Sequence, residues 1–259
     1  MGGGGGCGFG QGADCIKRAA SIIRGSRDAV AFTGAGISTD SGIPDFRGRQ
    51  GLWKRFDPRM ATRSFMLEDP KAFWEFYAMR FEALAGAKPN KGHRALARLE
   101  GEGLLAAVIT QNIDGLHVEA GSKRVIELHG NIRNSRCEDC GAVRTTEECV
   151  GFVRREGGVP RCGCGGLIRP SVVLFEEPVD MFEAALRIAQ ESDLCIVVGS
   201  SLTVYPAAAI PDVVKSAGGR LIIINADPTP LDARADLLIR DGATPALAGI
   251  TRALGLGKV

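Results

Sequence analysis

The sequence predicts an α/β fold in which helices cover both faces of a parallel sheet, with a smaller lobe beside it. Short apolar runs recur along the chain and are nearly free of charge, which is typical of strands buried on both faces. Helical patterns lie between several of these runs, and strands that alternate with helices favour a parallel sheet. Two segments break the alternation, and they predict the smaller lobe.

The expected elements follow in chain order. The first is a helix that Asp14 caps and Gly25 ends. Apolar runs then predict buried strands at residues 29–32, 105–109, 124–128, 194–198, 221–224 and 237–239. Helical spacing of apolar residues predicts helices at 93–99, 181–188 and 206–217. Ligands of such sheets bind beyond the carboxyl ends of the strands, so we expect the site there.

Composition divides the chain into four kinds of segment. Residues 1–12 are mostly glycine and are expected to form a flexible tail, since glycine loses much entropy on ordering and buries little. A Rossmann-like, nucleotide-binding domain is expected over residues 13–48, 93–130 and 170–259. We expect a helical insertion at 49–92 and a glycine-rich, zinc-binding module with paired cysteines at 131–169.

The bulk composition is ordinary for a soluble globular protein and argues against some partners. The chain has 45% hydrophobic residues, 24% charged residues and a net charge of +2 without a basic stripe, so we expect no direct nucleic-acid partner. The longest uncharged run, 194–211, contains glycine, serine and proline, so we expect no membrane partner. The absence of a signal peptide predicts a cytoplasmic location, and we expect a monomer.

The cysteines predict a metal site, because thiols in a reducing compartment seldom form disulfides. Four of the eight fall in two close pairs and are the predicted ligands: Cys137, Cys140, Cys162 and Cys164. The other four are scattered: Cys7, Cys15, Cys149 and Cys195. Four thiolates suit one structural Zn²⁺ and leave no open position for catalysis. Unrelated thiols and a redox pair are the alternatives. The second pair has a single intervening residue, so Cys149 is an alternative fourth ligand.

A glycine-containing loop follows the first predicted strand directly. Its sequence from residue 33 to 38 is TGAGIS, and glycine there permits a tight turn and the approach of phosphates to backbone amides. The third glycine of the usual fingerprint is missing, so this segment alone fits a nucleotide loop and a plain turn about equally. The continuation TDSGIPDFR at 39–47 is too polar for a core and favours a binding loop.

Polar residues also follow the next two predicted strands. Gln111, Asn112 and Asp114 come after the second strand, where amides and carboxylates can bind ribose hydroxyls and a carboxamide. His129 ends the third strand and faces the same crevice, and its ordinary pKa near neutrality suits a general base. His93 and His117 lack such a placement, so we interpret them as structural.

These motifs together resemble the sirtuins. The stretch GAGISTDSGIPDFRG at 34–48 matches the sirtuin signature without a break, and the family's QNID and HG elements recur at 111–114 and 129–130. The resemblance implies that His129 is the catalytic base and that Asn112 also serves catalysis. It further implies that NAD is bound by the loop and by the polar turn: Gly34, Ala35, Gly36, Ile37, Asp45, Phe46, Arg47, Gln111, Asn112, Ile113 and Asp114.

Shorter motifs extend the resemblance along the chain. Turns after the last three predicted strands resemble the loops that hold the adenosine half of NAD: Gly199, Ser200, Ser201, Asn225, Ala226, Asp227 and Ala243. The run 172–177 resembles the strand that pairs with a substrate peptide, which makes Val173 and Phe175 substrate-binding residues. Glu176 stands where the family normally has glycine, and it could favour basic residues that flank the acyl-lysine.

Tyr77 and Arg80 are three residues apart on a predicted helix, so they share one face. The ordinary interpretation is that the tyrosine packs against its neighbours and the arginine is solvated. The segment also resembles the Tyr-x-x-Arg pair of the desuccinylase and demalonylase type (class III) of prokaryotic sirtuins. In that type an arginine fork grips the terminal carboxylate of the acyl chain.

The resemblance implies an NAD-dependent protein-lysine deacylase, which is a deacetylase that also removes succinyl and malonyl groups. The acyl oxygen attacks the ribose carbon as nicotinamide leaves, and His129 deprotonates a ribose hydroxyl, which attacks the acyl carbon. Water then releases lysine and O-acyl-ADP-ribose. Acylated lysine-containing proteins are the expected partners. A protein mono-ADP-ribosyltransferase and a non-catalytic NAD-sensing protein are the alternatives. The missing third glycine disfavours a dehydrogenase.

Overall fold

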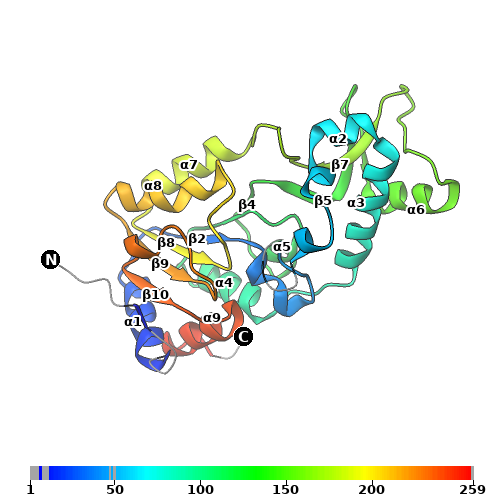
Figure 1. Ribbon diagram of the computed structural model, residues 1–259. Coiled ribbons are helices and arrows are strands. Elements are labelled where there is room, and N and C mark those ends of the chain that lie inside the picture. Colours follow the sequence, from blue (N-terminus) through cyan, green and yellow to red (C-terminus); the bar gives the residue numbers. More distant parts are fainter. Residues whose placement is uncertain (1–5, 8–11, 47, 49–50, 258–259) are drawn as a thin grey trace.

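The computed structural model describes residues 6–7, 12–46, 48 and 51–257. They form a large lobe around a parallel sheet and a smaller lobe to one side of it (Figure 1). Arg47 and most of the predicted tail lie outside the described residues. Within the described ranges, no helix combines the length and the apolar character needed to cross a membrane.

The large sheet has the strand order of a Rossmann fold with one strand added at an edge. Among the described residues it contains seven parallel strands, in the order β1 (Gly6–Cys7), β10 (Leu237–Ile239), β9 (Arg220–Ile224), β8 (Leu194–Val198), β2 (Ala29–Thr33), β3 (Ala107–Thr110) and β4 (Val125–Glu127). The chain builds outward from β2 in one direction and from β8 in the other. Ligands of such sheets bind at this switch point, beyond the carboxyl ends of β2 and β8.

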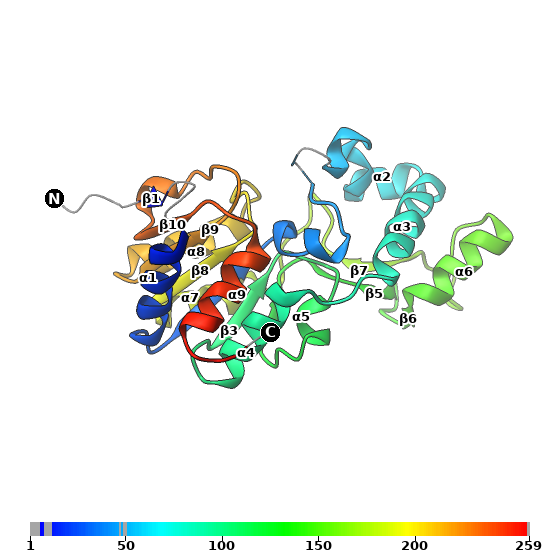
Figure 2. The same cartoon turned by 90° about the horizontal axis from the view of Figure 1, so that it is seen from below.

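Helices cover both faces of this sheet, as the apolar runs predict (Figures 1 and 2). One face packs against α1 (Gly12–Arg24), α4 (Lys91–Gly101) and α9 (Ala243–Ala253), and the other against α7 (Phe182–Glu191) and α8 (Ile210–Ser216). In β2, Ala29 and Ala31 face the first core while Val30 and Phe32 face the second. The short helix α5 (Leu116–Glu119) lies between β3 and β4 in the chain.

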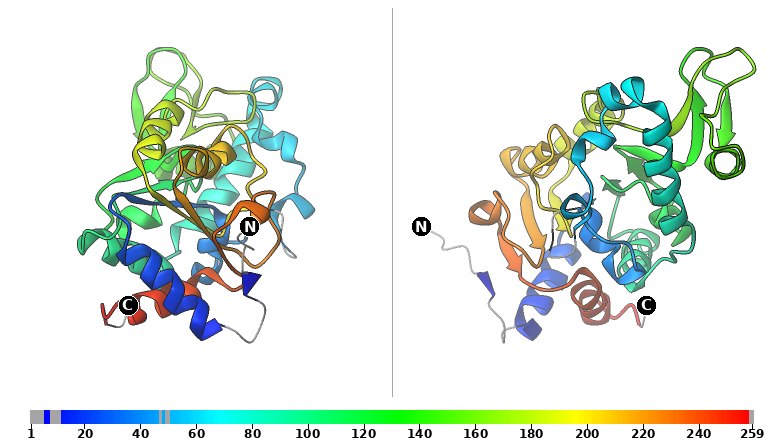
Figure 3. Two further views of the ribbon diagram at one scale, coloured as in Figure 1. Left: turned by 90° about the vertical axis from the view of Figure 1, so that its left-hand side faces the viewer. Right: turned by 45° about the vertical axis from the view of Figure 1, so that its right-hand side comes forward.

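The smaller lobe joins the helical insertion to the cysteine module through one shared core (Figure 3). Helices α2 (Arg63–Glu68) and α3 (Pro70–Ala85) pack near an antiparallel sheet of β6 (Val143–Thr145), β5 (Gly130–Cys137) and β7 (Ile168–Val172), with α6 (Thr146–Glu156) beside it. The buried indole of Trp74 donates a hydrogen bond of 2.8 Å to the carbonyl of Ile168. This sheet starts at 130 and ends at 172, so it reaches past the predicted module at both ends.

The structure confirms the predicted fold class and corrects several details at the amino end. Gly6 and Cys7 form β1 beside β10, whereas the sequence predicted a flexible tail there. Backbone pairing with an exposed sheet edge needs no side chains, so a glycine-rich segment can supply it. Helix α1 begins at Gly12, so Asp14 lies in its first turn and is not its cap. Cys15 is disulfide-bonded, although we expected a scattered thiol.

The predicted helix at 206–217 is also divided. Its first turn is a 3₁₀ helix, Ala207–Ala209, and α8 begins only at Ile210. Pro211 occupies the first turn of α8, where its missing N–H costs no helical hydrogen bond.

Candidate active site

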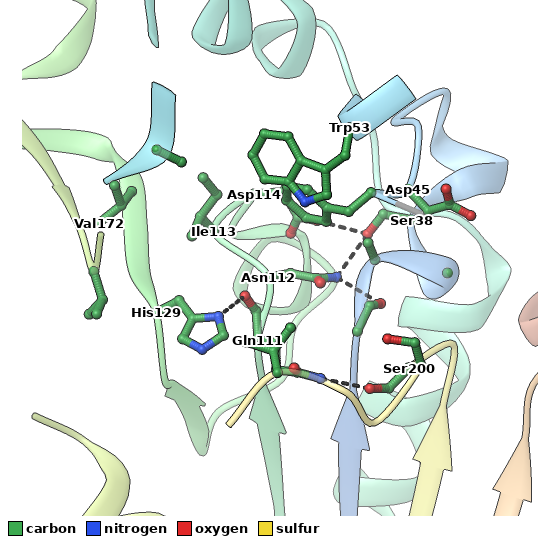
Figure 4. A pocket seen from close by; sticks show the side chains of 18 of the residues that line it. Ser38, Asp45, Trp53, Gln111, Asn112, Ile113, Asp114, His129, Val172 and Ser200 are labelled. Atoms are coloured by element: carbon green, nitrogen blue, oxygen red, sulfur yellow. Dashed lines mark hydrogen bonds between the residues drawn. The ribbon is translucent and has the colours of Figure 1, made fainter. Parts of the chain in front are cut away.

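A cavity of about 390 Å³ lies between the carboxyl ends of the large sheet and the smaller lobe. Its floor comes from the loops after β2, β3 and β8, and its far wall comes from the helical insertion and the segment after β7 (Figure 4). Most residues of the predicted site line it: Gly34, Ala35, Gly36, Asp45, Phe46, Tyr77, Arg80, Gln111, Asn112, Ile113, Asp114, His129, Val173, Phe175, Gly199, Ser200, Ser201, Asn225 and Asp227.

The loops after β2 and β8 touch through glycines. The amide of Gly36 donates a hydrogen bond of 2.8 Å to the carbonyl of Gly199. A Cβ atom on Gly36 would lie 2.7 Å from the Cα of Gly199, and a Cβ on Gly199 would lie 2.4 Å from the amide nitrogen of Ile37. Gly199 also has φ of 61°, in the left-handed region that favours glycine. Side chains are therefore excluded from this contact, and the backbone of the two loops lies at the cavity floor.

Asn112 and Asp114 are fixed by hydrogen bonds to the loop after β2 (Figure 4). The side-chain amide of Asn112 donates hydrogen bonds to the carbonyl of Gly34 and to Oγ of Ser38, both at 3.2 Å. Ser38 in turn donates to the carboxylate of Asp114 at 2.7 Å. Gln111 donates to Oγ of Ser200 at 2.8 Å, which ties β3 to the loop after β8. These polar groups are therefore oriented before any ligand arrives.

His129 is half-buried at the cavity wall and is held in one tautomer (Figure 4). Its Nδ1 lies 3.0 Å from the carbonyl oxygen of Gln111. A carbonyl can only accept, so Nδ1 carries the proton and Nε2 keeps its lone pair. Burial lowers the pKa of His129, while the hydrogen bond to Gln111 opposes that shift. The neutral imidazole therefore has a free basic nitrogen at neutral pH.

His93 and His117 lie in the core below the cavity, as we expected of structural residues. Both are buried, and their rings meet edge to face with centroids 4.9 Å apart. Burial lowers the pKa of His93 to about 4 and that of His117 to about 3. His93 lies 3.3 Å from Oγ of Ser38, and His117 lies 2.9 Å from Oγ1 of Thr33. Both neutral rings thus support the loop from beneath.

Tyr77 and Arg80 reach the cavity from α3. Burial raises the pKa of Tyr77 to about 12, so its hydroxyl keeps its proton. The guanidinium of Arg80 lies 5.1 Å from the ring centroid of Phe46 and 5.9 Å from that of Phe76. Within the described part of the chain, no carboxylate pairs with Arg80 and no hydrogen bond engages the hydroxyl of Tyr77. Two hydrogen-bond donors, the guanidinium of Arg80 and the hydroxyl of Tyr77, therefore face the cavity without a polar partner.

The segment after β7 forms the other part of the far wall. The amide of Val173 donates to the carbonyl of His129 at 2.9 Å, and the amide of Phe175 donates to the carbonyl of Ala61 at 3.0 Å. Glu176 has φ of 78°, which explains why glycine suits this position. Its carboxylate accepts hydrogen bonds from the amide and hydroxyl of Ser64, at 2.9 and 2.6 Å. This carboxylate is therefore already engaged within the chain.

The four paired cysteines form one cluster in the smaller lobe. Their Sγ atoms all lie within 4.8 Å of one another, and the closest contacts are 3.5 to 3.6 Å. A tetrahedral Zn²⁺ with bonds of about 2.3 Å separates its sulfurs by about 3.8 Å, so these thiolates fit one structural ion. The tight Cys162-x-Cys164 pair does not prevent this geometry. Cys149 is buried elsewhere and is not part of the cluster.

Some predicted residues lie away from the cavity, and some residues that line it were not predicted from the sequence. Ile37 and Ala243 are buried in the core under the sheet, and Ala226 is exposed outside the cavity lining. Trp53 lines the cavity, with its ring 5.2 Å from Phe46 and 6.4 Å from Phe175. A single tryptophan in an irregular segment gives no periodic signal. The other unpredicted lining residues include Ala61, Leu84, Val204, Tyr205 and Pro206.

Comparison with known proteins identifies the relatives of this chain. A profile of the Sir2 family matches residues 34–206. The NAD-dependent protein deacetylase of Sulfolobus acidocaldarius is 55% identical over 225 residues, which cover 87% of this chain and 89% of that protein. The NAD-dependent protein deacylase of Aeropyrum pernix is 47% identical over 247 residues, which cover 94% of this chain and 99% of that protein.

Solved structures agree with this relationship. A Sir2 protein in complex with a p53 peptide and NAD⁺ superposes with a TM-score of 0.85 at 40% identity, covering 93% of this chain and 99% of that one. A Sir2 variant with a deacetylated p53 peptide and 3′-O-acetyl-ADP-ribose gives a TM-score of 0.88 at 40% identity, covering 92% and 97%.

The contact between the two glycine loops gives a first prediction. Gly199→Ala should lower the free energy of unfolding by about 2–4 kcal/mol, because the methyl group meets backbone atoms and the residue is strained at positive φ. NAD should also bind more weakly. Gly218→Ala is the matched control, since Gly218 has φ of 93° but open space around it. Urea unfolding and calorimetric titration with NAD measure both effects. Equal losses in the two variants would show that the close approach is unimportant.

The cysteine cluster gives a second prediction. Purified protein should contain one zinc ion per chain, and Cys164→Ser should lose it together with several degrees of melting temperature, because the smaller lobe loses a cross-link. Cys149→Ser is the control, since that thiol lies outside the cluster. Atomic absorption and thermal melting measure the two quantities. A full zinc content in Cys164→Ser would contradict the ligand assignment.

Proposed function

The chain belongs to the Sir2 family, and within that family we propose that it removes both acetyl and acidic acyl groups from protein lysines. It is an enzyme of the NAD-dependent protein deacetylase or deacylase class. One observation carries the broader acyl range. Arg80 and Tyr77 face the cavity that also holds the basic nitrogen of His129, and neither has a polar partner in the described chain.

The residues at the cavity floor suit NAD. When bound, NAD supplies a ribose carbon that exchanges nicotinamide for the acyl oxygen. The glycines of the loop after β2 would let the pyrophosphate approach the backbone without a side chain in the way. Gln111, Asn112 and Asp114 offer amide and carboxylate groups to the adjoining ribose and carboxamide. Their fixed orientation saves ordering entropy, which matters because an amide oxygen is a weak nucleophile.

His129 would act as the general base. Its Nδ1 proton is held by the carbonyl of Gln111, so Nε2 can accept a proton from a ribose hydroxyl. The proton then lies on an imidazolium that the same carbonyl stabilises. The lowered pKa keeps this ring neutral at physiological pH, and the base is therefore ready before each turnover.

We call the part of the cavity beside Tyr77, Arg80, Trp53 and Phe175 the acyl pocket, and it would recognise a carboxylate. Phe46, Phe76 and Trp53 make the surroundings apolar, and an unpaired guanidinium there lacks most of its hydration. A succinyl or malonyl carboxylate would restore the missing charge partner, with the hydroxyl of Tyr77 as a further donor. An acetyl group, being smaller, would occupy the same pocket without that gain.

His129→Ala should abolish deacylation while NAD still binds, since the ring supplies a base and not a main NAD contact. Product formation from acetyl-lysine peptide is followed by mass spectrometry, and the NAD dissociation constant by calorimetry. Nicotinamide release by the wild type should require the acylated peptide. Release that accompanies ADP-ribosylation of unacylated protein would instead favour a transferase, and a fully active variant would remove His129 from the mechanism.

Arg80→Met should lower kcat/KM for a succinyl-lysine peptide about 10–100-fold, the factor expected for loss of a charged hydrogen-bonded contact. The same variant should keep most of its activity on the matched acetyl-lysine peptide, which serves as the internal control. Mass detection of both products in parallel reactions gives the ratio. Unchanged desuccinylation, or an equal fall for both peptides, would defeat the proposed acidic specificity.

A further inference from the structure

Four charged side chains connect the cysteine cluster to the wall of the acyl pocket. We call Arg63, Glu138, Arg169 and Glu177 the four-charge cluster. In the sequence, Glu138 lies between Cys137 and Cys140 of the cysteine cluster, and Arg63 is the first residue of α2. Arg169 belongs to β7, and Glu177 belongs to the segment after β7 that lines the cavity. The four-charge cluster thus joins the cysteine module at 131–169 (the metal module), the helical insertion, and the cavity-lining segment 172–177, which we call the substrate wall.

Arg63 bridges the two glutamates. Its Nη1 lies 2.6 Å from Glu138 and 3.0 Å from Glu177. Arg169 forms the second side of the cluster, with a close pair to Glu177 and a longer contact of 3.6 Å to Glu138. The side chain of Arg169 is fully buried, whereas 41% of Arg63 is exposed. Arg63 can therefore be replaced with less risk to the fold.

The cluster also sets the backbone of the substrate wall. Glu177 accepts a hydrogen bond of 2.9 Å from the amide of Leu174, and its own amide donates to the carbonyl of Leu174 at 3.2 Å. Arg169 donates to the carbonyl of Val172 at 2.6 Å. The position of Glu177 therefore determines the turn from Leu174 to Glu177, whose residues line the cavity.

Arg63 holds the same wall through its main chain. Its amide donates to the carbonyl of Phe175 at 3.2 Å, next to the bond between the amide of Phe175 and the carbonyl of Ala61. Phe175 lines the cavity and packs against Trp53. A shift of Arg63 would move one aromatic side of the acyl pocket.

The charges balance only when Glu138 is in place. Two guanidinium groups then face two carboxylates, so the buried Arg169 is compensated. Without Glu138, the buried Arg169 and the partly exposed Arg63 share the single carboxylate of Glu177, and their like charges repel. The location of Glu138 depends in turn on the cysteines that flank it.

We infer that Arg63 is a positioning residue that couples the geometry of the metal-binding cysteine cluster to the substrate wall of the acyl pocket. This inference rests on the proposed deacylase function. It implies that the metal module contributes to acyl-peptide binding over and above its contribution to stability. The nucleotide half of the cavity, which belongs to the other lobe, should not respond.

The test measures binding of a fluorescent acetyl-lysine peptide and of NAD to Arg63→Met and Glu138→Gln. Each variant should weaken peptide binding about tenfold, as expected for loss of a partly buried charged pair. NAD affinity and zinc content should stay close to the wild-type values in both variants, and the melting temperature should stay close to that of the wild type in Arg63→Met, whose side chain is partly exposed. Arg154→Met is the matched control, since Arg154 pairs with Glu82 in the same lobe at similar exposure but away from the wall.

Two further measurements separate coupling from simple damage. The double variant of Arg63→Met with Glu138→Gln should bind peptide about as well as either single variant, because both act through one contact. Removal of zinc by a chelator should weaken peptide binding of the wild type but add little to Arg63→Met. Wild-type peptide affinity in Arg63→Met, or an equal loss of NAD and peptide binding, would overturn the inference. A wild-type protein that binds no acyl-peptide would instead overturn the proposed function.

Discussion

The structure depends above all on the contact between two glycine loops at the switch point of the sheet. Gly36 and Gly199 approach so closely that neither position has room for a Cβ atom. This contact joins the loops that follow β2 and β8. The two strands are adjacent in the sheet, although about 165 residues separate their loops in the chain. The contact keeps side chains away from this part of the cavity floor, and it supports Ser38, to which Asn112 and Asp114 are hydrogen-bonded.

The polar side chains next to this contact explain how one cavity can bind both NAD and an acyl-lysine peptide. Hydrogen bonds from Asn112 and Gln111 connect β3 to the loops after β2 and β8, so the nucleotide side is rigid before binding. The carbonyl of Gln111 also sets the tautomer of His129, which stands at the boundary between the nucleotide side and the substrate wall. Gln111 therefore both orients the nucleotide side of the cavity and keeps Nε2 of His129 available as a base.

The smaller lobe follows a different physical principle. The cysteine module has little apolar surface of its own, and its buried residues share a core with the helical insertion. Thiolates and ion pairs therefore carry much of its organisation: the cysteine cluster closes one end, and the four-charge cluster reaches from there to the substrate wall. The acyl pocket is thus shaped by parts of the chain far apart in sequence.

The sequence alone determined the fold class, the strands from β2 to β10 of the large sheet, the nucleotide loop and the four clustered cysteines. These features depend on local periodicity or on short motifs, which act over a few residues. The tertiary structure decided what depends on distant partners. It paired Gly6 and Cys7 with β10, placed Ile37 and Ala243 in the core, excluded Cys149 from the cysteine cluster, and brought Trp53 into the cavity. It also assembled the four-charge cluster, because a side chain's partner across more than 70 residues is set by packing and leaves no trace in the local pattern.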